Sequence, residues 1–335
     1  MVYKEQKNSG AFLEVKDLVV EYFSKDAVVH AVNGVSFRLE KGQTLGLVGE
    51  TGAGKTTIAK AILRILPDVG ARMVSGQVLL EGKDIVSIQE SEMRQVRGKK
   101  ISMIFQDPMT ALNPVQTVGS QIEEVVSLHG KGTKADFQRR AEEMLEMVGI
   151  PKERYNEYPH QFSGGMKQRV VIAIALACNP ELLLADEPTT ALDVTIQAQV
   201  LRLISQLRER LGTSMILITH DMGIVATFCD YVAVVYAGNI VEYGDKVQIF
   251  DHRCHPYTIG LFGAIPNMEL DENRLHPIEG LPPDPTNLPE GCAFWPRCQY
   301  ATEQCKHGTI EMVTTPDGHL CRCCNLDAVM KEGKE

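Results

Sequence analysis

The chain has few aromatic residues, no excess of basic residues and no long apolar run. Of its 335 residues 6% are aromatic, and 34 Lys and Arg stand against 43 Asp and Glu, for a net charge of −9. General nucleic-acid binding needs a basic surface, so this balance disfavours it. No apolar run approaches the roughly 18 residues of a membrane span. Membrane association would therefore need a partner.

The N-terminus also lacks an apolar segment. Residues 1–7, Met-Val-Tyr-Lys-Glu-Gln-Lys, have charges but no apolar core behind them, unlike a secretory signal. Hydrophobic content is 44% and charged content 23%, as in ordinary globular proteins. We therefore expect a cytoplasmic protein, and its length allows about two domains.

The nine cysteines are unevenly placed. Six of them fall between Cys292 and Cys324, and the other three are scattered through the earlier part of the chain. A reducing cytosol disfavours a disulfide framework. A metal or metal–sulfur site is the natural alternative for the cluster.

A glycine-rich stretch follows the apolar run 45–48 and precedes a helical pattern at 57–63. It consists of Gly49, Glu50, Thr51, Gly52, Ala53, Gly54, Lys55 and Thr56. Strand, glycine-rich turn and helix are the context of a phosphate-binding loop. Its backbone N–H groups and the helix N-terminus attract phosphate. Lys55 is expected to reach the β- and γ-phosphates, and the Thr56 hydroxyl to bind Mg²⁺.

Strand and helix patterns alternate along most of the chain. Apolar alternation over 12–22 and 28–40 predicts an antiparallel region, and 231–236 with 240–243 predicts a hairpin. Further strands are expected at 78–80, 101–105, 182–184 and 215–218, and helices within 110–160, 164–178 and 195–211. This alternation predicts an α/β fold with a mainly parallel sheet.

Three polar motifs follow predicted strands. The apolar run 182–184 leads to Asp186 and Glu187, placing Asp186 to hold Mg²⁺ and Glu187 to polarise a water. His220 follows 215–219 and Gln106 follows 101–105, where each is expected near the γ-phosphate. Taken alone, a lone His at such a place is more often structural.

Residues 162–168 open the helix that runs to Cys178. Ser163 is a good helix N-cap, and Gly164 and Gly165 leave backbone donors open, so this is a second anion-binding helix N-terminus. A plain helix cap is the alternative. Two such ends need not meet within one protomer; they can meet across a two-fold dimer.

In this order, the motifs resemble those of the ATP-binding subunits of ABC transporters. They correspond to the Walker A loop at 49–56, the glutamine loop at Gln106, a variant signature at 162–166, the Walker B end at 186–187, the dimer loop at 191–193 and the switch histidine His220. The resemblance covers about residues 12–250. It implies an ABC-type P-loop nucleotide-binding domain at 1–250, with a mainly parallel core sheet, an antiparallel β subdomain and a helical subdomain at about 107–178.

The resemblance also implies site residues. Those expected to bind ATP are Tyr22, Gly49, Glu50, Thr51, Gly52, Ala53, Gly54, Lys55, Thr56, Thr57, Ser163, Gly164, Gly165 and Asp193. Thr56, Gln106 and Asp186 are expected at Mg²⁺, and Glu187, His220 and Gln106 in hydrolysis. Phe162 and Met166 depart from the commonest signature, whereas Ser163 and Gly165 are intact.

The tail resembles the dipeptide/oligopeptide (peptide/nickel) importer branch of this family. The matching segments are 255–258 (His-Pro-Tyr-Thr), 264–266 (Ala-Ile-Pro) and 291–298 with Cys305 beyond. We expect a small, irregular C-terminal module at 251–335. Some members of the branch carry an iron–sulfur cluster there, which implies Cys292, Cys298, Cys305 and, five residues after Gly318, Cys323 as ligands.

The cysteine spacings fit neither a ferredoxin nor a zinc-finger pattern. Four thiolates suit either a 4Fe-4S cluster or zinc, and free structural thiols are a further alternative. Cys321 and Cys324 flank Cys323, so the fourth ligand stays open between the three.

The resemblance implies an ATPase that powers import of di- or oligopeptides. Its implied partners are a second ABC ATPase subunit, identical or related, two membrane permease subunits and, indirectly, an extracellular substrate-binding protein, but no nucleic acid. Its implied location is the cytoplasmic side of the cell membrane. The alternatives are a nickel or other small-solute importer and a soluble ABC ATPase acting on nucleic acid. The cysteine module could also be a redox sensor.

Overall fold

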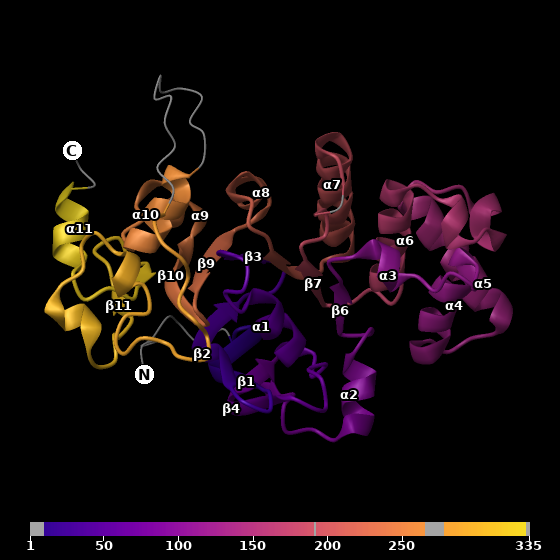
Figure 1. Cartoon of the computed structure of the whole chain (residues 1–335). Coiled ribbons are helices and arrows are strands. Elements are labelled where there is room, and N and C mark those ends of the chain that lie inside the picture. Colours follow the sequence, from indigo (N-terminus) through magenta and orange to yellow (C-terminus); the bar gives the residue numbers. More distant parts are fainter. Residues whose placement is uncertain (1–9, 191, 265–277, 333–335) are drawn as a thin grey trace. The chain divides into compact units, whose positions relative to one another are not determined.

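The chain folds into two compact units. The computed structural model describes residues 10–190, 192–264 and 278–332 (Figure 1). The first unit combines residues up to 39, 45–86 and 219 onwards, and the second combines 40–44 with 87–218. Predictions for the N-terminal leader, for Ala191 and for the Ile265-Pro266 segment lie outside the described residues.

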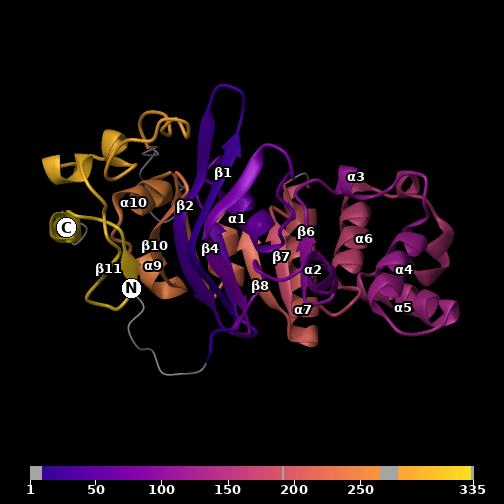
Figure 2. The same cartoon turned by 90° about the horizontal axis from the view of Figure 1, so that it is seen from below.

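A four-stranded antiparallel sheet belongs to the first unit. Its strands, in the order β2-β1-β4-β5, are β2 (Val28–Leu39), β1 (Leu13–Phe23), β4 (Ala71–Leu80) and β5 (Lys83–Asp84). Figure 2 shows β1, β2 and β4 side by side. Alternate residues of β1, such as Leu13 and Val15, are buried, which is the period-2 pattern of a half-buried strand. The predicted antiparallel region is confirmed.

The first unit holds a second group of strands. In the order β11-β12-β10-β9-β3, they are β11 (Val313–Thr314), β12 (Leu320–Cys321), β10 (Asn239–Asp245), β9 (Tyr231–Tyr236) and β3 (Thr44–Val48). β3 and β9 are parallel, and the other neighbours are antiparallel. The predicted hairpin β9–β10 is confirmed; Ala237 and Gly238 turn the chain with positive φ, as a tight hairpin requires.

The helices of the first unit are short. They are α1 (Lys55–Ile62), α8 (Met222–Phe228), α9 (Lys246–Asp251), α10 (Pro256–Gly263), α11 (Leu326–Glu332) and the 3₁₀ turns η3 (Trp295–Arg297) and η4 (Glu303–Lys306). The described residues beyond 250 pack within this unit, and β12 extends the edge of β10. The predicted domain boundary at residue 250 stays a prediction.

The second unit is α/β. Its strands β6 (Ile101–Ile104), β7 (Leu182–Asp186) and β8 (Ser214–Ile218) are parallel and fully or almost fully buried. Strands buried on both faces read as continuous apolar runs, which is why these segments show no alternation. Three helices accompany them: α2 (Glu90–Val96), α3 (Pro108–Ala111) and α7 (Val194–Leu211).

The remaining helices of the second unit lie together in Figure 1. They are α4 (Val118–His129), α5 (Lys134–Met147), the 3₁₀ turns η1 (Lys152–Asn156) and η2 (Pro159–Gln161), and α6 (Gly164–Leu176). Thr133 caps α5 in a capping box with Asp136. Within the described part of the chain, no helix has both the length and the apolar character to cross a membrane.

Candidate active site

The glycine-rich loop 49–56 connects β3 to α1 in the first unit. Gly49 and Gly54 have φ of 149° and 101°. A Cβ at Gly49 would collide with the backbone carbonyl of Val235, and one at Gly54 with that of Ala31. Only glycine therefore fits at these two positions, and the loop lies directly on neighbouring backbone.

Lys55 is held beneath this loop. Its side chain is buried, and Nζ donates to the carbonyl oxygens of Gly49 and Glu50 at 2.8 and 2.9 Å. Two hydrogen bonds from within the loop fix the ammonium at the start of α1, whose first turn contains no acidic residue. The loop, the helix N-terminus and the ammonium together form a site suited to an anion.

Two other predicted residues lie near the loop's helix and strand. The Tyr22 hydroxyl is 3.3 Å from Thr57 Oγ1 on α1. His220 is exposed and directly follows Thr219, whose N–H donates to Leu47 of β3. The structure thus brings Tyr22 and His220 to elements that flank the loop, and their roles stay predictions.

In the second unit β7 ends in the two predicted carboxylates. Asp186 is buried, and Glu187 follows it with φ 44°, an uncommon conformation for a residue with a side chain. Glu187 Oε2 accepts from Gln106 Nε2 at 3.0 Å and from Thr190 Oγ1 at 2.8 Å. The structure therefore joins two of the predicted hydrolytic residues, and it adds Thr190, which the sequence analysis missed.

The second helix N-terminus forms as the sequence predicts. Ser163 Oγ accepts from Met166 N at 3.4 Å and caps α6. Asp193 caps α7 by accepting from Ile196 N at 3.0 Å. A Cβ on Gly165 would lie 2.8 Å from Ile196 Cγ2, so these two helix starts approach each other closely.

Phe162 and Met166, the two residues that depart from the commonest signature, both contact Arg154. Arg154 lies over the Phe162 ring, 4.2 Å from its centroid, and donates to the sulfur of Met166 at 3.3 Å. Glu157 pairs with the same guanidinium. The aromatic ring and the thioether therefore both serve as partners for one arginine, which gives the variant signature a local structural reason.

The clustered cysteines surround a small cavity in the first unit. Five thiols line it, together with aromatic residues that include Phe294 and Trp295; the cysteines are Cys292, Cys298, Cys305, Cys323 and Cys324. The sulfurs of Cys305 and Cys324 are 3.2 Å apart. Cys321 does not line this cavity. All four predicted ligands thus come together, with Cys324 as a fifth thiol.

Burial changes the acidity of these thiols. It raises the pKa of Cys298 to about 11 and that of Cys323 to about 12. Both are therefore neutral thiols at pH 7 when no cation is near them. The gathered sulfurs have the chemistry of a site for a soft metal or a metal–sulfur cluster.

Known protein families match two stretches of the chain. Residues 32–190 match the family described as ABC transporter, and 241–305 match the oligopeptide/dipeptide transporter C-terminal region. The oligopeptide transport ATP-binding protein OppD of Bacillus subtilis is 53% identical over 86% of this chain and 82% of its own length. OppD of Haemophilus influenzae is 49% identical over 93% of this chain and 96% of its own length. The chain belongs to the ATP-binding proteins of oligopeptide and dipeptide ABC transporters.

Solved ABC cassettes share the fold of this ABC ATPase. A dimeric ATP-binding cassette in a post-hydrolysis state, bound to ADP and phosphate, has a TM-score of 0.62 and 26% identity, covering 70% of this chain and 98% of its own. A component of an ABC transporter complex from Clostridium perfringens has a TM-score of 0.62 and 28% identity. The match covers 72% of this chain and 90% of that one. The predicted fold class is confirmed.

Sequence reasoning missed one contact of this ABC ATPase. Arg297, next to Cys298, donates to both carboxylate oxygens of Glu50 in the phosphate loop, at 2.8 and 3.0 Å. Its side chain is 5% exposed. Tyr257 adds a second link, since its hydroxyl accepts from Glu50 N at 2.8 Å. No local pattern points to a contact across 247 residues.

Proposed function

We propose that this protein is the ATPase subunit that powers import of di- or oligopeptides by an ABC transporter. The observation that carries the proposal is the Glu187 carboxylate, positioned by Gln106 and Thr190 at the end of β7 in a chain that also forms a phosphate loop. The relatives are named for oligopeptides and dipeptides, as is DppD of Bacillus subtilis at 47% identity. This favours peptides over nickel.

The phosphate loop binds the nucleotide. Lys55 and the N-terminus of α1 neutralise the β- and γ-phosphates, and Tyr22 stacks on the adenine. Thr56 and Asp186 are the residues that would hold Mg²⁺, which would supply positive charge against the phosphates. The rest of the nucleotide contacts come from Gly49, Glu50, Thr51, Gly52, Ala53, Gly54 and Thr57 of the same chain.

Glu187 orients the attacking water and takes up its proton. Gln106 holds this carboxylate and would contact Mg²⁺ or the water, and His220 would donate to the γ-phosphate. General-base catalysis contributes about 10²–10⁴-fold to a rate. Loss of the carboxylate is therefore expected to lower kcat by this factor while ATP binding persists.

The Glu187→Gln variant tests this mechanism. In proteoliposomes that hold the assembled transporter, ATP turnover and uptake of a labelled peptide should fall together, by about 10²-fold or more. The Kd for ATP should stay within about threefold, because the amide keeps the shape of the side chain. Glu124→Gln, an exposed change on α4, is the matched control. Turnover of Glu187→Gln at the control rate would contradict the proposed base.

The protein works as a pair. Ser163, Gly164, Gly165 and Asp193 of one subunit complete the nucleotide site of a second ABC ATPase subunit, either identical or related. ATP binds the closed pair better than the open pair, so ATP binding and hydrolysis alternate the two states. The pair drives two permease subunits at the cytoplasmic face of the membrane, to which a substrate-binding protein delivers the peptide. No nucleic acid takes part.

We propose in addition that the cysteine cavity holds a 4Fe-4S cluster, with zinc as the alternative. Cys292, Cys298 and Cys305 are three ligands, and Cys323 is the fourth in preference to Cys324. The bound group would cross-link η3, η4 and the segment after β12. The five gathered thiols support the proposal.

Metal analysis tests the cysteine proposal. Protein purified without oxygen should contain about four irons per chain and absorb in the visible range, and Cys298→Ser should lose both. Cys178→Ser, which changes a thiol on the second unit, should lose neither. About one zinc in place of iron, lost in the same variant, would establish the alternative. Neither metal in the wild type would contradict both.

A further inference from the structure

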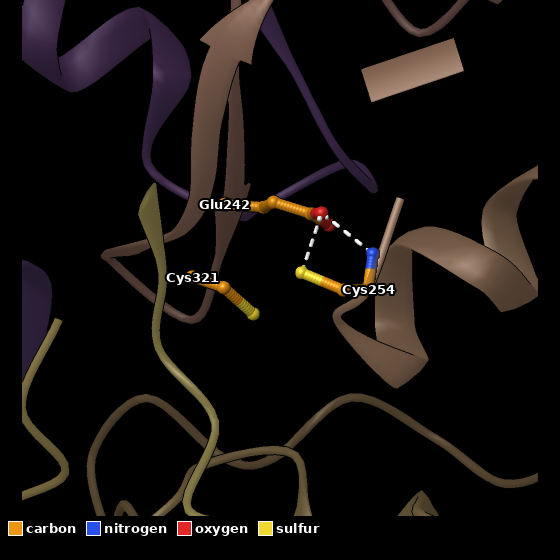
Figure 3. Close-up of side chains that lie close together, drawn as sticks. All are labelled: Glu242, Cys254 and Cys321. Atoms are coloured by element: carbon orange, nitrogen blue, oxygen red, sulfur yellow. Dashed lines mark hydrogen bonds between the residues drawn. The ribbon is translucent and has the colours of Figure 1, made fainter. Parts of the chain in front are cut away.

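Apart from the cysteine cavity, the first unit contains a second cluster of four side chains of the kinds that bind metals. They are Glu242 of β10, Cys254 before α10, and His319 and Cys321 at β12. Each is at most 2% exposed. Figure 3 shows Glu242, Cys254 and Cys321 converging from these three segments. None of the four lines the cysteine cavity, so this cluster is distinct from it.

The ligand atoms are close to one another. One carboxylate oxygen of Glu242, the Cys254 sulfur and the Cys321 sulfur all lie within 4.8 Å of one another. His319 Nε2 is 3.0 Å from Glu242 Oε1 and 3.2 Å from Cys254 Sγ. The Cys254 sulfur is itself 3.3 Å from that same oxygen. The His319 nitrogen and the Cys254 sulfur therefore both lie within hydrogen-bond distance of Glu242 Oε1.

These distances agree with a slightly collapsed metal site. Zinc binds nitrogen and oxygen at about 2.0–2.1 Å and sulfur at about 2.3 Å. A tetrahedron with these bonds has edges of about 3.3 Å between nitrogen and oxygen and about 3.5 Å where one atom is sulfur. The observed separations of 3.0, 3.2 and 3.3 Å need to widen by only a few tenths of an ångström.

Surrounding groups already orient the ligands. His319 Nδ1 lies 2.8 Å from Asp317 Oδ1 and 3.0 Å from Thr315 Oγ1, and this leaves Nε2 pointing into the cluster. Metal-bound histidines are usually held in this way, by a carboxylate on the other ring nitrogen. The second oxygen of Glu242 accepts from His255 N at 3.1 Å.

Backbone pairing fixes the spacing of the cluster. Glu242 and Cys321 are direct partners in the β10–β12 ladder. Side chains of such partners start about 4.5–5.5 Å apart, close enough to share one ion. His319 lies two residues before Cys321 and so points to the same face of the sheet.

The charges also suit a dication. Two thiolates, one carboxylate and a neutral imidazole around a dication leave a net charge of −1. Arg253 lies near enough to Glu242 to interact with its charge. This arginine offsets the remaining charge, which matters because an unbalanced buried charge is costly.

We propose that Glu242, Cys254, His319 and Cys321 form a closed, structural site for Zn²⁺. Two sulfurs, one imidazole and one carboxylate match the ligands that zinc accepts, and four protein ligands leave no open position for catalysis. On binding, Zn²⁺ displaces the thiol protons of Cys254 and Cys321 and any proton on His319 Nε2. The ion would fasten β12 to β10 and to the start of α10.

Cobalt substitution tests the site directly on the full-length wild type. Co²⁺ added to metal-free protein should produce intense visible bands typical of tetrahedral geometry and near-ultraviolet bands from thiolate ligands. The wild type should bind about one equivalent per chain more than Cys321→Ser, because the thiols of the cysteine cavity can bind Co²⁺ as well. Zinc should abolish these bands. Weak octahedral bands, or none, would overturn the proposal without any variant.

Variants then locate the ion. Cys254→Ser and Cys321→Ser should each lose about one equivalent of zinc, whereas Cys229→Ser, a buried thiol elsewhere in the first unit, should lose none. Circular dichroism checks that each variant folds. Zinc that is lost in Cys298→Ser but kept in Cys321→Ser would belong to the cysteine cavity and would overturn the proposal. ATP turnover is not the readout, so failure here leaves the ATPase proposal standing.

Discussion

Glu50 connects the phosphate loop to the cysteine-rich segment. Its backbone belongs to the phosphate loop, and its carboxylate is bound at both oxygens by Arg297 from the cysteine-rich segment. The pairing raises the pKa of Arg297, despite the opposing effect of burial. The guanidinium also donates to the Tyr236 hydroxyl and to the carbonyl oxygen of Glu279. Arg297 therefore connects the segment next to Cys298 directly to the phosphate loop.

Arg297→Ala is expected to destabilise the protein by about 1–3 kcal/mol, because it leaves a half-buried carboxylate without its partner. The KM for ATP should rise more than kcat falls, since the loop loses support but keeps Lys55. Urea unfolding and ATPase kinetics measure the two effects. Arg297→Lys should recover only part of both, because lysine cannot bind two oxygens in one plane.

A matched control is Arg202→Ala, an exposed change on α7. The double variant Glu50→Ala/Arg297→Ala should be less destabilised than the sum of the two single variants, because the two groups interact directly. Additive effects in this cycle would show that the contact does not stabilise the loop.

Among the helices and strands, the sequence predicted those that are encoded by patterns of neighbouring residues. The apolar runs of β6, β7 and β8 and the Ser163 cap of α6 are each encoded within a few residues. The β9–β10 hairpin follows from its turn residues in the same way. Short-range patterns were sufficient for most of the fold and for the positions of the nucleotide motifs.

The C-terminal segment was harder to predict for a physical reason. β12 has two residues, too few to show a periodic pattern, and it forms only by pairing with β10. The Glu242 cluster depends on that pairing, and the Arg297–Glu50 pair joins residues that are 247 positions apart. Contacts of this kind depend on the folded backbone. The gathering of the cysteines was predictable because their density alone signals a shared site.

At the scale of the whole molecule, the two helix N-termini belong to different compact units. The phosphate loop belongs to one compact unit and Ser163 to the other. If a second subunit completes each nucleotide site, ATPase activity per chain should rise steeply with protein concentration and then level off, whereas ATP binding should not. Turnover assays and equilibrium binding over a dilution series measure this.

The same dilution series with Ser163→Arg separates pairing from folding. This variant should bind ATP with an unchanged Kd, yet its activity should stay low at every concentration, because the arginine obstructs the partner's site. Arg139→Ala, an exposed change on α5, is expected to behave like the wild type. Activity per chain that is independent of concentration in the wild type would contradict a shared site, unless the pair stays associated when diluted, which light scattering would detect.

The contact between Glu50 and Arg297 has a consequence for synthesis. Ribosomes add about 5–20 residues per second, so the partner of Glu50 is made roughly 10–50 s after the loop itself. His30 shares this dependence, since its N–H donates to Pro285. During that interval the phosphate loop of the nascent chain lacks the contact between Arg297 and the Glu50 carboxylate. A chain that ended before Arg297 would therefore lack both hydrogen bonds to the Glu50 carboxylate.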